Sequence, residues 1–192
     1  MKKEQIENIS SKKFNAKEWN PLIKYFWDRY NKRYFNQIEI LQNHKEFEIR
    51  NNCGFLIVSI DCILIETLEQ YYGGSDESIG KSHHPFLLFF NRASAFKKII
   101  KNKEDAGKFA GLIRSGLLHQ SKTKKESIIN KKSKTPIIGW IDVDDKSKGF
   151  EINRDKFHKS VKSEFKNLIN EIKKVENVEL RNRFKDKISS IV

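Results

Sequence analysis

A chain of 192 residues is long enough for one domain with its own core, and a formal net charge of +13 favours polyanionic partners such as RNA, DNA or an anionic membrane surface. Its 14 Phe, 5 Tyr and 3 Trp exclude an intrinsically disordered chain, which would contain few aromatic residues. A solvated lysine coat without any such partner accounts for the charge equally well. With only 9 Gly and 3 Pro, long helices are expected.

The N-terminal third of the chain predicts a polar tail followed by a long helix. Residues 1–14 are charged and polar, and we expect them to form a frayed basic N-terminus before a single domain over residues 15–192. Apolar and aromatic side chains recur at helical spacing over residues 15–41, with Asn15 as the N-cap. This pattern predicts a first helix that faces the core.

A second helix is expected over residues 48–72, where a Gly-Gly pair follows the last periodic position. Its centre is apolar on nearly all sides, which is typical of a helix in the middle of a bundle. Asp61 and Glu66 interrupt that centre, and a buried carboxylate needs a cation or a hydrogen-bond donor. Either carboxylate is therefore expected to pair with Arg114.

The apolar runs, cysteines and histidines favour neither a membrane protein nor a metal site. The most apolar run, residues 55–68, carries two carboxylates and is shorter than the roughly 20 residues that span a bilayer. The N-terminus is too polar for a secretory signal, and Cys53 and Cys62 fit buried free thiols, so we expect a cytoplasmic protein. Neighbouring His83 and His84 would face apart on a helix and have no evident third ligand. No metal or other cofactor is expected.

The second half of the chain predicts further helices, a basic segment and a β-hairpin. An apolar run at 86–90 and an amphipathic stretch at 105–119 predict core helices. Six lysines over residues 122–134 form the most basic segment. Alternating apolar residues at 136–143 and 149–152 flank turn residues, which predicts a small β-hairpin before the C-terminal helices. The predicted fold class is mainly α, a helical bundle with one inserted hairpin.

The residues best suited to chemistry lie at the end of the helix that precedes the lysines. Arg114 and His119 are separated by four residues. A guanidinium keeps its charge and has planar donors that match phosphate oxygens, and an imidazole titrates near neutrality and so transfers protons. Lys122, Lys124 and Lys125 follow as candidate RNA-binding residues. Positions five apart on a helix diverge by roughly 140°, so the pair converges only if the helix ends near residue 118 or if the side chains approach from two flanks.

At Arg114-x4-His119 the chain resembles the HEPN superfamily, whose signature is an Arg, four to six residues and a His. An apolar helix before the motif helix is similar too, and as a pattern the resemblance covers about residues 15–175. The resemblance implies a HEPN-like helical bundle that acts as a metal-independent endoribonuclease in bacterial defence or a toxin–antitoxin system. It also implies a homodimer with one composite active site, and an antitoxin or defence-complex partner. Glu66, Ser115 and Gln120 would support the catalytic pair.

Two departures from the family and one alternative stand beside this interpretation. Ser115 occupies a position where the family often has Asn, Asp or His, and Ser121 occupies one where some toxins carry a Tyr that their antitoxin modifies. That mode of control is therefore not expected. In the alternative, Arg114 is a structural cation paired with Glu66, and His119 caps its helix. The chain would then be a non-catalytic nucleic-acid-binding or regulatory subunit, or a scaffold subunit, of a defence complex.

Overall fold

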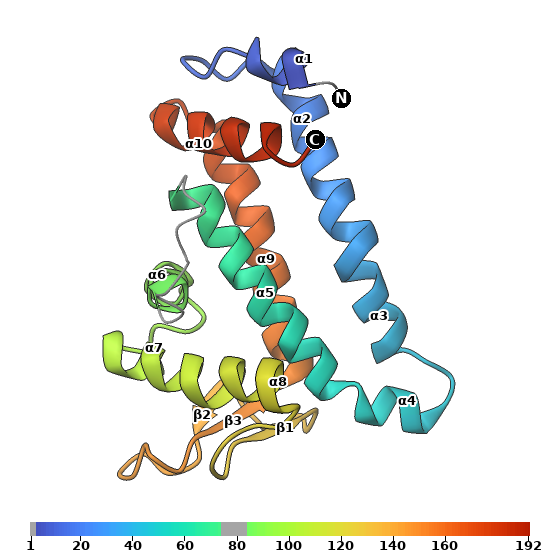
Figure 1. Ribbon diagram of the computed structural model, residues 1–192, viewed down its shortest axis with the longest axis vertical. Coiled ribbons are helices and arrows are strands. Elements are labelled where there is room, and N and C mark those ends of the chain that lie inside the picture. Colours follow the sequence, from blue (N-terminus) through green and yellow to red (C-terminus); the bar gives the residue numbers. More distant parts are fainter. Residues whose placement is uncertain (1–2, 74–83) are drawn as a thin grey trace.

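The computed structural model describes residues 3–73 and 84–192, and in these residues the protein is a mainly helical bundle with one three-stranded sheet (Figure 1). The helical elements are α1 (Lys3–Glu7), α2 (Ala16–Tyr30), π-helical η1 (Asn31–Phe35), α3 (Asn36–Gln42), α4 (Phe47–Asn52), α5 (Gly54–Gly73), α6 (His84–Arg92), α7 (Lys103–Phe109), π-helical η2 (Ala110–Arg114), α8 (Ser115–Gln120), α9 (Arg154–Lys173) and α10 (Val178–Ser189). The strands are β1 (Ile128–Asn130), β2 (Ile138–Trp140) and β3 (Phe150–Asn153).

Helices α5 and α9 pack against each other in the centre of the molecule. The run α2–η1–α3 lies along one side of them, and α10 crosses one end (Figure 1). At the other end, the run α7–η2–α8 lies over the small sheet. The apolar centre of α5 predicted this position, because a helix without a polar face is stable only where other elements surround it.

The predicted first helix is confirmed, and it continues through a π-helical segment to the end of α3. The Asn15 side chain accepts a hydrogen bond of 3.0 Å from a backbone N–H of the first turn, as expected of an N-cap. Phe26 and Phe165 join this helix to α9, with ring centroids 5.8 Å apart. The aromatic positions that revealed the helix in the sequence are thus core contacts.

The prediction of a frayed N-terminus over residues 1–14 is wrong for the part that the structure describes. Helix α1 packs against α10, with Ile6 fully buried and Ile9 only 7% exposed. The Arg181 side chain of α10 donates a 2.8 Å hydrogen bond to the backbone carbonyl of Ser11. Two isolated isoleucines carry too little periodicity to reveal a helix in the sequence, yet their burial fixes this segment.

The predicted β-hairpin is confirmed, and the sheet has one strand more. Strands β2 and β3 are antiparallel, with Ile138 opposite Ile152. Strand β1 pairs in parallel with the other edge of β3, with Ile129 opposite Ile152. The lysine-rich segment thus contains a short strand that the sequence did not predict, and it is held to the core by the sheet.

The predicted helix over residues 48–72 is two helices, α4 and α5, with a break at Cys53. Cys53 and Cys62 are free and buried, as predicted. Within residues 3–73 and 84–192, no helix combines the length and apolar character needed to cross a membrane. Of the neighbouring histidines, His83 lies outside the described residues and His84 begins α6.

Candidate functional site

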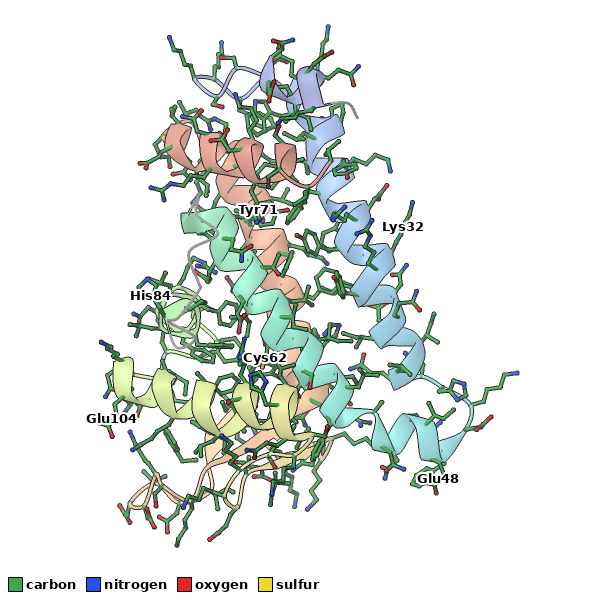
Figure 2. All side chains as sticks on the ribbon, viewed as in Figure 1. Lys32, Glu48, Cys62, Tyr71, His84 and Glu104 are labelled. Atoms are coloured by element: carbon green, nitrogen blue, oxygen red, sulfur yellow. The ribbon has the colours of Figure 1, made fainter. Side chains whose placement is uncertain are left out.

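Arg114 and His119 lie side by side at the surface where α8 contacts α5. The Nη1 of Arg114 is 3.2 Å from the Nε2 of His119, and the imidazole is exposed. The helix does not end near residue 118 but continues to Gln120, so the two side chains meet although the first condition for their convergence is not fulfilled. Figure 2 labels Cys62, which lies on α5 one helical turn before the carboxylate that holds Arg114.

Glu66 of α5 fixes the orientation of the guanidinium. Its Oε1 accepts from Nε of Arg114 at 2.7 Å, and its Oε2 accepts from Nη2 at 3.4 Å. The two side chains are 21% and 19% exposed, so water screens this ion pair only in part. The prediction that Asp61 or Glu66 pairs with Arg114 is confirmed for Glu66, and the pairing directs Nη1 toward His119.

The contact between Arg114 and His119 indicates which ring nitrogen of a neutral imidazole would carry the proton. A guanidinium only donates hydrogen bonds, so Nε2 of His119 must accept, and the ring proton of a neutral imidazole then lies on Nδ1. A phosphate oxygen is a stronger acceptor for a guanidinium than a neutral ring nitrogen is. A bound phosphodiester would therefore draw Arg114 away and leave the Nε2 lone pair free to accept a proton.

A tight turn after α8 brings the lysine segment back against the motif helix. Ser121 ends the helix in the left-handed conformation, with φ 53°. The N–H of Lys124 donates 2.9 Å to the carbonyl of Leu112, inside η2, where the π-helical turn has altered the usual pairing. A Cβ on Gly116 would lie 2.4 Å from the carbonyl oxygen of Lys122. Only glycine at position 116 therefore allows the chain after α8 to pass this close to the helix.

We expect Gly116→Ala to lower the free energy of unfolding by about 1–3 kcal/mol, because the added methyl group meets a backbone oxygen that must move. Gly111→Ala is the matched control in the same helix, since a Cβ added there would enter open space, with no packed neighbour within 4 Å. That control should be neutral or stabilising by less than about 1 kcal/mol. Urea unfolding of both variants measures the difference, and equal stability of the two would contradict the close packing at Gly116.

The remaining predicted site residues surround the pair without touching it. Ser115 is half-buried and Gln120 is exposed, and among the described residues neither is hydrogen-bonded to Arg114 or His119. Lys122 and Lys125 are exposed, and Lys124 is half-buried. The lysines therefore supply positive charge beside the pair, whereas the structure assigns no contact with the pair to Ser115 or Gln120.

Two further pairs of acidic and basic side chains involve α5, and the sequence did not predict their partners. Asp61, fully buried, has its Oδ1 2.8 Å from Nδ1 of His158 on α9. The Glu69 carboxylate accepts hydrogen bonds from both terminal nitrogens of Arg92 on α6, at 2.5 and 2.9 Å. Burial raises the pKa of both carboxyls, and the hydrogen bonds from their partners oppose that rise. A buried carboxylate in the sequence signals that a partner exists but leaves its position unknown.

Two of the hollows in the described part of the chain show that the larger recesses are not lined by Arg114 or His119. One, of about 800 Å³, lies between the ends of α5, α9 and α10 beside Tyr72 and Arg183. The other, of about 570 Å³, lies beside Phe55 at the start of α5. Among residues 3–73 and 84–192, no group of three or more His, Cys, Asp or Glu side chains is arranged to hold a metal ion.

Comparison with known proteins adds no relative. No family model matches the chain, and neither the curated proteins nor the solved structures give a significant match.

Proposed function

We propose that this protein is a metal-independent endoribonuclease of the HEPN type. The proposal is carried by the 3.2 Å contact between Arg114 and His119 at an exposed helix surface, with the guanidinium aligned by Glu66. A guanidinium beside an imidazole is suited to bind a phosphodiester and to move a proton at the same place. The lysines that follow supply the charge that attracts RNA.

The proposed reaction is an attack by the ribose 2′-OH on the adjacent phosphorus. Arg114 binds a non-bridging phosphate oxygen and stabilises the negative charge that develops on it. The Nε2 of His119 accepts the 2′-OH proton as the O2′–P bond forms. The P–O5′ bond then breaks, and O5′ takes a proton from a protonated imidazole. The products are a 2′,3′-cyclic phosphate and a 5′-OH end.

The second proton transfer is the reason to propose a homodimer. One imidazole that has just accepted a proton is poorly placed to protonate the leaving group on the opposite side of phosphorus, whereas the partner subunit's His119 could donate there. Leu56 and Ile63, 51% and 42% exposed, lie seven residues apart on one face of α5 and leave an apolar stripe beside Glu66. We propose that this stripe packs against a second copy, so that two motifs face one groove.

Ile63→Asp should weaken dimerisation by on the order of 100-fold, because it would bury an unpaired carboxylate in the interface. Cleavage should fall in parallel, whereas the folded monomer should persist because the side chain is exposed. Val175→Asp, at a position 82% exposed in the turn after α9, is the matched control. Analytical ultracentrifugation checks the prediction, and an unchanged dimer, or a monomeric wild type that cleaves RNA, would refute the composite site.

The proposed function is tested by incubating the purified protein with total RNA in EDTA. We expect cleavage products that end in a 2′,3′-cyclic phosphate, which resist extension until the phosphate is removed. A strict requirement for a divalent metal ion would overturn the proposed chemistry. In cells, poor growth on expression of the wild type but not of a His119 variant would support a toxin or defence setting, with an antitoxin or defence-complex partner.

The alternative is a nucleic-acid-binding or regulatory subunit without catalysis, and the Glu66–Arg114 pair favours it. Two of the three guanidinium nitrogens are engaged by Glu66, as expected of a structural cation. This alternative predicts salt-sensitive binding through Lys122, Lys124 and Lys125 without any product. The EDTA cleavage assay separates the two functions directly.

A further inference from the structure

The hollow of about 570 Å³ at the start of α5 is lined by aromatic, amide and basic side chains, the kinds that contact single-stranded RNA. It lies where α4 meets α5, against β1 and the start of α9. The lining side chains that matter here are one aromatic ring, three amides and two lysines, namely Phe55, Asn51, Asn52, Asn130, Lys131 and Lys132.

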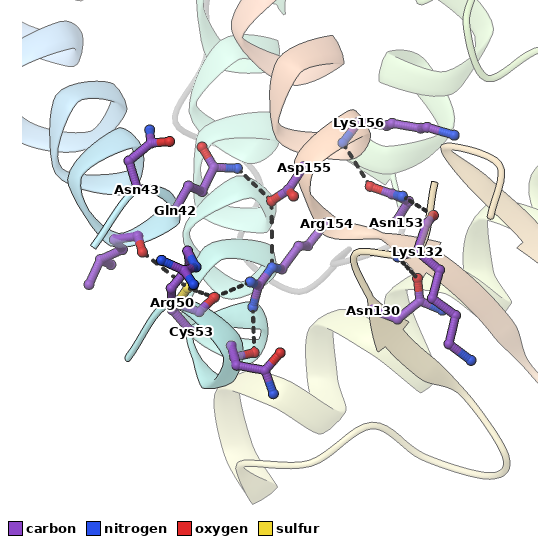
Figure 3. A network of polar contacts seen from close by, with 12 residues as sticks. Gln42, Asn43, Arg50, Cys53, Asn130, Lys132, Asn153, Arg154, Asp155 and Lys156 are labelled. Carbon is purple, nitrogen blue, oxygen red and sulfur yellow. Dashed lines mark hydrogen bonds and ion pairs between the residues drawn. The ribbon is translucent and has the colours of Figure 1, made fainter. Parts of the chain in front are cut away.

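A buried arginine holds the walls of this pocket together. Arg154, 2% exposed, donates from Nη1 to the carbonyl of Asn51 at 2.9 Å and from Nη2 to the carbonyl of Arg50 (Figure 3). A Cβ on Gly54 would lie 3.2 Å from the Arg154 side chain, so glycine allows the helix to begin this close. Arg154 thus connects the α4–α5 break to α9, and one wall of the pocket is formed before any ligand binds.

The opposite wall is fixed by hydrogen bonds between the lysine segment and strand β3. Asn153 Nδ2 donates 2.7 Å to the carbonyl of Lys132, and Asn130 Nδ2 donates 2.8 Å to Oε1 of Glu151. The Lys131 and Lys132 side chains remain exposed. With Arg154 the pocket therefore holds three cationic groups, and two carboxylates lie next to its lining: Asp155, 3.5 Å from Arg154, and Glu151, which accepts from Asn130.

These groups match the parts of one nucleotide. Phe55 is 42% exposed, so its ring is open to stacking by a base, a contact that every base can make. The Asn130 amide is held by Glu151 and by the N–H of Lys132, so the amides offered to the edge of an unpaired base are Asn51 and the carbonyl oxygen of Asn52. Lysines neutralise the adjacent phosphates. A base held in a duplex could not reach the ring, so the arrangement favours a single strand.

The pocket and the Arg114–His119 pair are aligned along one helix. Phe55 and Glu66 are 11 residues apart on α5, which places them within roughly 20° of the same face and about 16 Å apart along the axis. The chain from residue 121 to 132 runs from the end of α8 to the pocket and carries lysines at both ends. A strand that follows this basic segment would therefore pass from the pocket to the pair.

We propose that this pocket binds a base of single-stranded RNA a few nucleotides from the phosphodiester at Arg114 and His119. It would set where an unpaired strand is cut. The inference rests on the proposed function for its ligand and for its distance from the cleaved bond.

The test measures binding of a fluorescent 12-nucleotide RNA whose 2′-O-methyl groups block cleavage. Phe55→Ala should weaken binding about ten-fold, and Phe55→Tyr should retain it, because a phenol ring stacks as well. Leu88→Ala on α6, 39% exposed, is the control of matched exposure and should bind like the wild type. Replacing Lys131 and Lys132 by Gln should lower the salt dependence by roughly one to two ion equivalents, and Phe55→Ala should leave it unchanged.

The outcomes separate the pocket from the nuclease. Weaker binding by Phe55→Ala in a protein that never cleaves RNA would support the pocket and refute the proposed reaction. Normal binding by Phe55→Ala in an active nuclease would overturn the pocket alone. Preference of the wild type for duplex over single-stranded RNA, or no binding of single-stranded RNA, would also overturn the pocket.

Discussion

Replacing His119 by alanine should lower the rate of RNA cleavage by about 10²–10⁴-fold, the usual contribution of a general acid or base. The imidazole is exposed and its ring is held by Arg114 rather than by core packing, so the variant should fold like the wild type. The measurement is the initial rate of cleavage of a defined RNA in EDTA. Circular dichroism and urea unfolding test whether the variant is folded and as stable as the wild type. If it is, the lower cleavage rate results from the missing imidazole and not from unfolding.

The matched control for this prediction is His44→Ala. His44 is a half-buried histidine in the loop between α3 and α4, and its Nδ1 accepts only a local backbone hydrogen bond from Glu46. Its removal should leave the rate of RNA cleavage unchanged.

Arg114→Lys keeps the charge but loses the planar guanidinium that contacts Glu66 and a phosphate oxygen together, so this variant should also cleave RNA much more slowly. Cleavage at the wild-type rate by His119→Ala would rule out the proposed chemistry.

Replacing His158 by alanine should lower the free energy of unfolding by about 3–5 kcal/mol, the usual cost of removing one partner from a buried pair. Asp61 is fully buried, and its second oxygen, Oδ2, has no hydrogen-bond partner among the described residues. The variant would therefore leave the whole carboxyl group without a donor. Urea unfolding at neutral pH measures the loss.

Protonation and a second substitution test the same prediction. Burial raises the pKa of Asp61, and removing His158 removes the hydrogen bond that opposes this rise. The penalty for a buried carboxylate should therefore be present above that raised pKa and should shrink as the pH falls through it. Combining Asp61→Ala with His158→Ala should cost less than the sum of the single variants. Strict additivity would contradict a direct pair.

Local patterns predicted the elements that regular periodicity marks. The helix capped by Asn15, the apolar helix α5 and the hairpin of β2 and β3 all follow from spacing within a short window. Strand β1 escaped because three residues among lysines show no alternation, and its stability comes from pairing with β3, more than 20 residues later. The buried N-terminal helix escaped for the same reason, since α10 lies at the far end of the chain.

The candidate site shows the same division between local and distant information. Arg114, His119 and the following lysines are visible as a motif, and a carboxylate inside an apolar helix requires a partner. Glu66 was one of two candidates for Arg114, and three-dimensional packing selected it. The partner of Asp61, His158, is 97 residues away in the chain, and nothing in the spacing of either residue connects them.

Helix α5 is apolar on nearly every side, so burial alone would leave several rotations and axial shifts of similar energy. Three of its acidic side chains pair with basic side chains on three different elements: Asp61 with His158, Glu66 with Arg114, and Glu69 with Arg92. A shift of α5 by one helical turn along its axis would separate all three pairs at once. We infer that these polar pairs fix the rotation and axial position of α5. The orientation of the Arg114 side chain therefore depends on the position of the whole helix.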